Sequence, residues 1–375
     1  MTESSVPAAS AASKEPARGS NRALIRRIVI AIVVPCAIGI GLIGLRSSTF
    51  GSPTALLAIG PENASYDFVH SELPEAYVFE GNGFDGMVFY TIARHPLDVR
   101  ATAENLKVPT YQLRRIMYPL AAKVVAPSGG VGLIYALAAL SLVGIAIGGW
   151  ALSRFPHAPP WLPITMVINA GTICALYTST ADALAAGLTI AAFGAILRRR
   201  FAAAIVLLAI AGLTRETSLI AVIALAAWPD LTPRRRVAAA IVPFLPVGLW
   251  SIYVSVVLRA SPFAQPDGGT FTAPFFGWAQ QTPVPGQLVL AVFTLGMMIA
   301  AIVIGWHTYR AICLYLIATV AVFVCATPII TQQWLGFARI TTVAFPLAVW
   351  LVIARVRAPR AFARGARPAV AATAR

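Results

Sequence analysis

The stretch GNGFDGMVFY, residues 81–90, places one carboxylate, Asp85, between glycines and aromatic side chains. A carboxylate can take a proton from an attacking hydroxyl and so act as a general base. Asp85 also fits a structural role, because an aspartate before an apolar run often caps a helix by accepting free backbone N–H groups. The local pattern favours the cap, and the two roles do not fully exclude each other.

A second stretch, YQLRRIMYP at 111–119, carries Arg114, Arg115 and Tyr118 among apolar residues that share one helical face. One interpretation is an amphipathic helix lying on a membrane, with its arginines touching lipid headgroups. The other is that one arginine holds a phosphate, for which a guanidinium is well suited. The stretch leaves both interpretations open.

The third stretch, TRETS at 214–218, puts Arg215 and Glu216 inside a long apolar run. Adjacent helix positions point about 100° apart, so these two side chains do not simply pair with each other and each needs another partner. Thr217 or Ser218 could cap a returning helix. Because charges at membrane depth are usually functional, we favour a functional role over a structural ion pair.

Two further charged residues lie near helix ends. Asp182, in TSTAD, is interpreted as a helix N-cap. Arg339, in QQWLGFAR, either extends to lipid headgroups or binds a phosphate. No metal-ligand spacing, CxxC pair, GxxxxGK[ST], GxGxxG after a strand or GxSxG occurs. The cysteines all fall in apolar runs and are interpreted as packing residues: Cys36, Cys174, Cys313 and Cys325.

The elements that must position these residues are apolar helices. The chain is 58% hydrophobic and 11% charged, with a mean hydropathy of +0.77, whereas soluble domains carry about 25% charged residues. This predicts an all-α, multi-pass membrane bundle. The net charge of +15 follows the ends of the apolar spans and does not indicate nucleic acid. We expect spans at 28–45, 129–153, 161–179, 183–197, 201–228, 237–258, 286–305, 309–328 and 340–354.

The run 201–228 decides the topology, because basic triplets at 198–200 and 234–236 flank it. If the run is a hairpin of two short helices and the N-terminus is cytoplasmic, 19 basic residues lie inside and ten outside. If it crosses once, 11 lie inside and 18 outside, which violates the positive-inside bias. We therefore expect about ten membrane segments with both termini cytoplasmic. Each hairpin arm spans only about 20 Å, so Arg215 and Glu216 are expected in a cavity open to the outside.

The expected organisation is a single membrane domain at 25–356. A disordered cytoplasmic tail precedes it at 1–24, and a basic cytoplasmic tail follows it at 357–375. Residues 47–128 are expected to form a large extracytoplasmic loop, in which YPLAAKVV is interpreted as an interfacial helix. Asp85 then lies outside the membrane, on the same side as the hairpin tip.

The order of these features resembles the GT-C superfamily of membrane glycosyltransferases. More narrowly, FDGMVFYTIARHPL, YQLRRIMYPLAA, ADALAAGL and LTRETSL resemble blocks of a bacterial GT-C-like family linked to cell-surface glycopolymer formation. The resemblance covers about 25–350 and rests on these four blocks. Phe84 stands where that family usually has Tyr, and Met87 where it usually has Gln, which removes a possible polar contact to the substrate.

The resemblance implies a sugar transferase in the bacterial plasma membrane, acting at the outer face with a polyprenyl-phosphate sugar as donor. The implied acceptor is an envelope glycan or lipid, and the implied reaction inverts the anomeric carbon. It assigns Asp85 as the base. Phosphate stabilisation is assigned to Arg115, Arg215 and Arg339, and Glu216 would orient an arginine or share a metal. Tyr118 and Asp182 match further substrate-binding positions of the family blocks. The sequence does not decide whether a divalent metal such as Mg or Mn is required. A transporter or flippase of lipid-linked sugars, or a non-catalytic partner in a glycopolymer complex, stays as an alternative.

Overall fold

The computed structural model describes residues 18–263, 272–280, 285–326 and 336–357, and within these ranges the chain is helical, with an isolated bridge between Ile59 and Val78. This confirms the all-α prediction. The prediction of a disordered tail at 1–24 is wrong for its last residues, because a helix begins at Arg18. The rest of this tail lies outside the described ranges, as do residues 358–375 of the predicted basic tail at 357–375. The first apolar segment consists of α1 Arg18–Ile28, a π-helical turn Val29–Val33 and α2 Val34–Thr49.

The segment between the first and second long helices folds into short helices. These are η2 Pro53–Leu57, α3 Tyr66–Glu72, α4 Asp85–Arg94, α5 Val99–Ala103, α6 Pro109–Gln112 and α7 Met117–Val125. They are followed by α8 Gly130–Leu152, η3 Leu162–Ile164, α9 Thr165–Ile168, α10 Ala170–Tyr177, α11 Asp182–Leu197 and α12 Phe201–Thr214.

The remaining elements are η4 Glu216–Ala221, α13 Val222–Ala226, α14 Pro233–Ile241, η5 Val242–Phe244, α15 Leu245–Leu258, α16 Phe276–Ala279, α17 Pro285–Gly305, α18 Arg310–Val324, α20 Gly336–Ile340 and α21 Ala344–Arg357. The expected span at 161–179 is therefore not one helix. Its chain breaks at Asn169, which has extended backbone and caps α10 by accepting a hydrogen bond from the Thr172 N–H at 2.9 Å.

Four helices in the described ranges are long and apolar enough to cross a membrane: Ala23–Thr49, Gly130–Leu152, Pro233–Leu258 and Pro285–Gly305. Shorter apolar helices lie among them, at Asp182–Leu197, Phe201–Thr214, Glu216–Ala226 and Arg310–Val324. These helices indicate a protein embedded in a membrane. Ten membrane segments stay a prediction, because by length and composition only four of the described helices qualify as spans.

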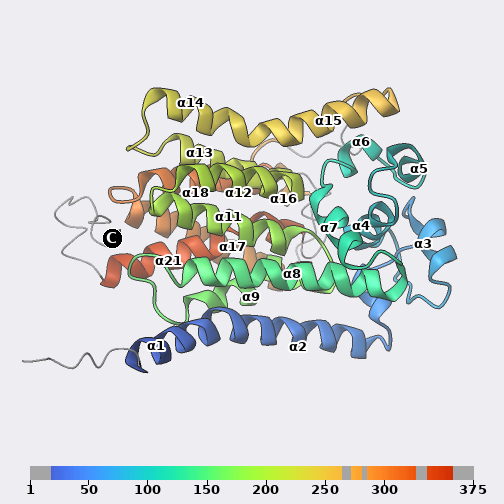
Figure 1. Ribbon diagram of the computed structural model, residues 1–375, viewed down its shortest axis with the longest axis horizontal. Coiled ribbons are helices and arrows are strands. Elements are labelled where there is room, and N and C mark those ends of the chain that lie inside the picture. The colour runs from blue at the N-terminus through green and yellow to red at the C-terminus, as the bar shows by residue number, and fades with distance from the viewer. Residues whose placement is uncertain (1–17, 264–271, 281–284, 327–335, 358–375) are drawn as a thin grey trace, which may run out of the picture.

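Burial separates a central helix from a lipid-facing perimeter. Nearly every residue of α11 is buried, and α11 lies between α8 and α12 (Figure 1). Helices α2, α15 and α17 instead expose large apolar side chains, such as Ile40, Leu249 and Val292, as helices facing lipid tails do. The charged residues carried by α11 and the hairpin after it are therefore held away from lipid.

The run 201–226 turns back on itself at Arg215, whose backbone is extended, and α12 packs against η4. Arg199, before the hairpin, forms an ion pair with Asp230, after it, at 3.3 Å. The two basic triplets that flank the run therefore lie at the same end of the molecule, which confirms the hairpin geometry. Which side of the membrane this end faces stays a prediction.

The short helices between α2 and α8 gather at one end of the molecule, whereas the start of α1 and the end of α21 lie at the other (Figure 1). Arg94, in α4, anchors this loop by binding Glu72 of α3 at 2.6 Å and the Ser128 carbonyl at 3.0 Å. We call the segment 50–128 the outer loop. Its helices bury their apolar side chains in one core with parts of α8 and α11, so the loop is a packed layer over the bundle.

Candidate active site

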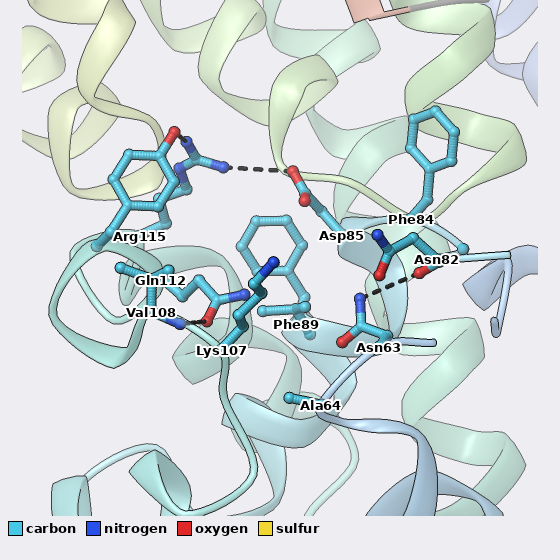
Figure 2. A pocket seen from close by; sticks show the side chains of 13 residues that line it. Asn63, Ala64, Asn82, Phe84, Asp85, Phe89, Lys107, Val108, Gln112 and Arg115 are labelled. Atoms are coloured by element: carbon cyan, nitrogen blue, oxygen red, sulfur yellow. Dashed lines mark hydrogen bonds and ion pairs between the residues drawn. The ribbon is translucent and has the colours of Figure 1, made fainter. Parts of the chain in front are cut away.

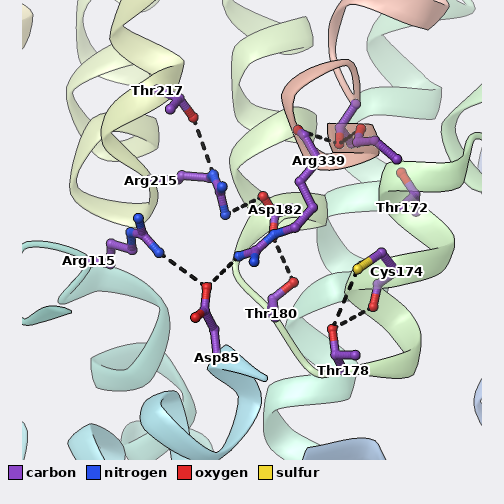
Figure 3. A network of polar contacts seen from close by, with 12 residues as sticks. Asp85, Arg115, Thr172, Cys174, Thr178, Thr180, Asp182, Arg215, Thr217 and Arg339 are labelled. Atoms are coloured by element: carbon purple, nitrogen blue, oxygen red, sulfur yellow. Dashed lines mark hydrogen bonds and ion pairs between the residues drawn. The ribbon is translucent and has the colours of Figure 1, made fainter. Parts of the chain in front are cut away.

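Three carboxylates and three arginines from distant parts of the chain meet where the outer loop covers the bundle. We call them the charged cluster: Asp85, Arg115, Asp182, Arg215, Glu216 and Arg339. Each was singled out in the sequence, and the structure brings all of them together. Their formal charges cancel. Figure 3 labels the three arginines and two of the carboxylates, Asp85 and Asp182.

Asp85 is the first residue of α4, and its preceding residue Phe84 makes no side-chain cap. The interpretation of Asp85 as a helix cap is therefore wrong. Its Oδ2 instead accepts hydrogen bonds from Arg339 Nη2 at 2.6 Å and from Arg115 Nη1 at 3.3 Å. Among the described residues no hydrogen bond reaches its Oδ1. One oxygen is thus held by arginines while the other stays available.

Glycines on both sides of Asp85 allow this placement. Gly83 has φ +63°, in the left-handed region, and packs against the Ala58 carbonyl. Gly86 lies so close to the Thr178 carbonyl that a Cβ atom there would come within 2.1 Å of its oxygen. Because Thr178 lies just before α11, this close approach brings the start of α4 beside the start of α11. Only glycine permits that contact without displacing backbone.

Asp182 is the first residue of α11, and its side chain is 1% exposed. Its interpretation as an N-cap is wrong, since α11 has no side-chain cap. The carboxylate contacts Arg215 Nη1 at 2.5 Å, accepts a hydrogen bond from Arg339 Nε at 2.9 Å and accepts another from the Thr180 hydroxyl at 2.7 Å. Asp182 therefore holds two arginines in place, and its position at a helix N-terminus favours its negative charge.

Glu216 binds Arg115 through two hydrogen bonds, from Nε at 2.9 Å and from Nη2 at 2.7 Å. Arg215 instead turns toward Asp182 and Thr217, so the prediction that neighbours in TRETS need different partners is confirmed. The predicted cap by Thr217 or Ser218 is wrong. Thr217 accepts a hydrogen bond from Arg215 Nε at 3.3 Å, and no side chain caps η4.

The two arginines of YQLRR diverge. Arg115 is 6% exposed and enters the charged cluster, so the interpretation that it touches lipid headgroups is wrong. Arg114 binds the Pro262 carbonyl instead. Arg339, whose side chain is 8% exposed, lies inside the protein and does not extend to headgroups. Tyr118 is fully buried, and its hydroxyl donates to the Leu137 carbonyl at 2.7 Å, so it supports the core beneath the site and does not line it.

Tyr111 and Thr180 belong to this site and were not predicted from the sequence. The Tyr111 hydroxyl accepts a hydrogen bond from Arg115 Nη2 at 2.6 Å, and the guanidinium carbon of Arg115 lies 4.8 Å from the Tyr111 ring centroid. The sequence contained a signal for Tyr111, because Tyr111 lies four residues before Arg115 and residues four apart on a helical turn are neighbours. Thr180 lies two residues before Asp182 in TSTAD, and its hydroxyl donates a hydrogen bond to the Asp182 carboxylate at 2.7 Å.

The cluster fixes the charge of Asp85. Burial raises the pKa of its carboxyl, but the positive charges of Arg339 and Arg115 lower it by more, so the net pKa lies well below its usual range. For Arg115, burial lowers the pKa, but Glu216, Tyr111 and Asp85 together raise it by more, so the net pKa lies well above its usual value. Asp85 is thus ionised at neutral pH, and in this arrangement it is a weak base.

A cavity of 170 Å³ opens beside Asp85 within the outer loop (Figure 2). Phe84 lines it, whereas Met87 is fully buried in the core of the outer loop and does not reach it. Replacement of the resembled family's Gln by Met87 therefore removes no group from this cavity.

Among the described residues, no group of three or more His, Cys, Asp or Glu side chains lies close enough to hold a metal ion. The carboxylates of the charged cluster are separated by arginines, whose charges repel a cation, so the residues present do not fit a divalent metal. The cysteines are all free, as expected of packing residues. Comparison with protein-family models, curated proteins and solved structures found no match for this chain.

Proposed function

We propose that this protein is a membrane glycosyltransferase of the GT-C type. It transfers a sugar from a polyprenyl-phosphate donor to a hydroxyl of an envelope glycan or lipid, at the face of the membrane that the outer loop occupies. The observation that carries the proposal is that Asp85 accepts hydrogen bonds from two arginines through Oδ2 alone and also lines a cavity. Such a site places a proton acceptor next to cations that suit a phosphate.

In the proposed reaction the acceptor hydroxyl attacks the anomeric carbon as Asp85 Oδ1 takes its proton. The bond between that carbon and the phosphate oxygen breaks, and its electron pair leaves with the polyprenyl phosphate. The arginines stabilise this anion, so no acid is needed to protonate it. A single displacement inverts the anomeric configuration. The proton passes from Asp85 to water after the acceptor leaves.

The charged cluster has no excess positive charge, so a phosphate must replace one of its carboxylates. Asp85 is the carboxylate most easily replaced. Its side chain is 36% exposed, compared with 26% for Glu216 and 1% for Asp182, and Arg115 holds Glu216 by two hydrogen bonds. A donor phosphate that takes Arg339 and Arg115 from Asp85 removes the charges that lower its pKa. Asp85 therefore becomes a stronger base only after the donor, which carries the leaving group, has bound.

The test is sugar transfer in lipid nanodiscs supplied with polyprenyl-phosphate sugars and crude envelope acceptor. We expect Asp85→Asn to lose transfer by a factor of about 100 or more, the usual contribution of a general base. The matched control is Glu104→Gln, which neutralises an exposed carboxylate in the same loop. Normal transfer by a folded Asp85→Asn protein would remove Asp85 as the base.

The hairpin formed by residues 201–226 favours transport as a second candidate function. Short helices that meet at charged residues within an apolar bundle also occur at transporter substrate sites. A transporter of lipid-linked sugars would move a labelled donor across the bilayer without forming a glycosidic bond. Measuring donor accessibility and product in the same vesicles separates the two functions, and a protein that does neither fits the role of a non-catalytic partner.

A further inference from the structure

The cavity beside Asp85 contains groups that the proposed reaction has not used. It lies between two segments of the outer loop, with Asn63 and Asn82 on one side and Gln112 and Arg115 on the other (Figure 2). We propose that this cavity is the acceptor subsite and that it binds one sugar ring, presenting a ring hydroxyl to Asp85. This inference rests on the proposed function for the role of the ring, but binding of a sugar there can be tested without transfer.

The size of the cavity fits a single ring. Its volume is 170 Å³, and a cavity of about 150 Å³ holds one six-membered ring such as benzene. The cavity is open on one side, so the rest of a longer glycan or a lipid aglycone has a path outward. The site therefore suits the terminal residue of a chain more than an internal one.

Two amides offer hydrogen bonds to hydroxyl groups. Gln112 Oε1 accepts a hydrogen bond from the Val108 N–H at 3.0 Å, which fixes the side chain and leaves its NH₂ group without a partner among the described residues. The Asn82 side chain likewise makes no hydrogen bond within the described part of the chain. Gln112 therefore offers a donor in a fixed position, and Asn82 offers both a donor and an acceptor, which suit sugar hydroxyls.

Asn63 has a different role. Its Oδ1 accepts from the Ser65 N–H at 3.1 Å, and its Nδ2 donates to the Asn82 carbonyl at 3.1 Å. Both ends of the side chain are thus used to hold the Asn82 segment in place. Asn63 is therefore a positioning residue for Asn82.

Aromatic side chains supply an apolar surface for the C–H face of a sugar. Phe89 and Tyr111 both line the cavity. Phe89 is held by an edge-on contact with Tyr118, at 5.3 Å between ring centroids, and Tyr111 is held by Arg115. Because both rings are fixed before a ligand arrives, little conformational entropy is lost on binding. The buried Tyr118 thus contributes to the subsite through Phe89.

The ring is assigned to the acceptor because of where the cavity lies relative to the arginines. The donor sugar is bonded to a phosphate. Two of the three arginines of the charged cluster, Arg215 and Arg339, lie outside this cavity, and Arg115 reaches from the cluster to its edge. Asp85 lies between the two regions, bound to Arg339 through Oδ2 and lining the cavity. A proton acceptor must contact the attacking hydroxyl, so the ring on the cavity side is the acceptor.

Binding can be measured by saturation-transfer NMR on the purified protein in nanodiscs, with methyl glycosides of glucose, galactose, mannose and arabinose as probes. We expect saturation of at least one glycoside by the wild type and by Asp85→Asn. Asn82→Ala and Gln112→Glu should each weaken binding about three- to tenfold, the effect of losing one neutral hydrogen bond. Gln112→Glu keeps the acceptor for the Val108 N–H and replaces the free donor group by a charged oxygen. An unfolding temperature equal to that of the wild type shows that the variant is folded.

The control is Glu104→Gln, an exposed position of the same loop outside the cavity, which should leave binding unchanged. The subsite is overturned if no glycoside binds the folded wild type, or if both cavity variants bind as the wild type does. Glycoside binding without any sugar transfer would sink the proposed function and leave the sugar site standing.

In transfer assays, the cavity variants should raise KM for the acceptor and leave KM for the donor unchanged. A rise in donor KM alone would assign the ring to the donor and overturn the acceptor assignment.

Discussion

Arginines at the two ends of this protein lie in opposite surroundings. At the outer-loop end, Arg115 and Arg339 have side chains that are 7% and 8% exposed, and each binds two carboxylates. At the other end, Arg199 is 58% exposed and has one partner, Asp230, at 3.3 Å. Exposed charges are screened by water and salt, whereas buried ones keep their geometry and interact strongly. The same residue type therefore forms an exposed basic surface at one end and a fixed electrostatic site at the other.

The surroundings of Arg154 and Arg198 support this contrast. Arg154 stacks over Trp150 at 4.0 Å, and Arg198 donates to the Gly194 and Arg154 carbonyls, both at 3.1 Å. No carboxylate is among these partners. Positive charge without compensating negative charge is what the positive-inside bias requires of a cytoplasmic end.

The largest expected effect is an all-or-none difference in labelling between the two ends. In a chain whose native cysteines are replaced by serine, we expect Glu104→Cys, in the outer loop, to react with a membrane-impermeant thiol reagent added outside intact cells. Arg199→Cys and Arg235→Cys should each stay unlabelled until the membrane is opened. Labelling of only one of these two positions would contradict the hairpin, and reversed accessibility would invert the proposed orientation.

The second comparison concerns ion pairs. Asp182→Ala removes a 1% exposed partner of two buried arginines, and we expect it to destabilise the fold by about 3–5 kcal/mol. Asp230→Ala removes the exposed partner of Arg199 and should change stability by about 0–1 kcal/mol. Thermal unfolding in nanodiscs measures both. Equal losses would mean that the two ends do not differ as described.

The third comparison concerns two glycines. A Cβ atom at Gly86 would come within 2.1 Å of the Thr178 carbonyl oxygen, so Gly86→Ala should push α4 away from α11 and cost about 1–3 kcal/mol. Gly41, in α2, has nothing within 4 Å of such an atom, and Gly41→Ala should be neutral or stabilising by up to about 1 kcal/mol. Unfolding temperature and sugar transfer are the two measurements. Full transfer by Gly86→Ala would show that the close approach does not position Asp85.

The smallest expected effect is a change in stability at low pH. Because the folded-state pKa of Asp85 lies below its unfolded value, the carboxylate stabilises the fold above about pH 4, and this contribution is lost as pH falls through the folded pKa. The difference in unfolding temperature between wild type and Asp85→Asn should therefore stay constant above about pH 5 and shrink at lower pH. A difference that does not change with pH would contradict the ion pairs of Asp85. Glu104→Gln is the control.

Much of the fold follows from hydropathy. Runs predicted at 129–153 and 286–305 are the helices Gly130–Leu152 and Pro285–Gly305, because a long apolar run must form a helix in lipid. The run at 161–179 was harder to predict, since apolar composition does not reveal that Asn169 satisfies its own hydrogen bonds and ends one helix while capping the next. The helix breaks at Asn169 because its side chain competes with the helix for backbone hydrogen-bonding groups.

For the candidate site, the sequence singled out the charged residues because charge is costly within an apolar chain. It did not give their partners. Asp85 and Asp182 each fit a helix cap as well as an ion pair. The choice depended on Arg339, which lies 254 residues from Asp85 and 157 residues from Asp182 along the chain. Tyr118 fitted the pattern of the site as well as Arg115 did, yet the two side chains point to different sides of their turn, one into the core and one into the charged cluster.

The sequence by itself determined that this is a helical membrane protein and which of its residues carry unusual charge, because hydropathy and charge are properties of each residue. Only the tertiary structure decided that Asp85 accepts hydrogen bonds from Arg115 and Arg339 through one oxygen, and that it lines a cavity together with Tyr111 and Gln112. Those contacts join segments that are far apart along the chain. Their energies depend on distance and burial, which exist only once the helices have packed.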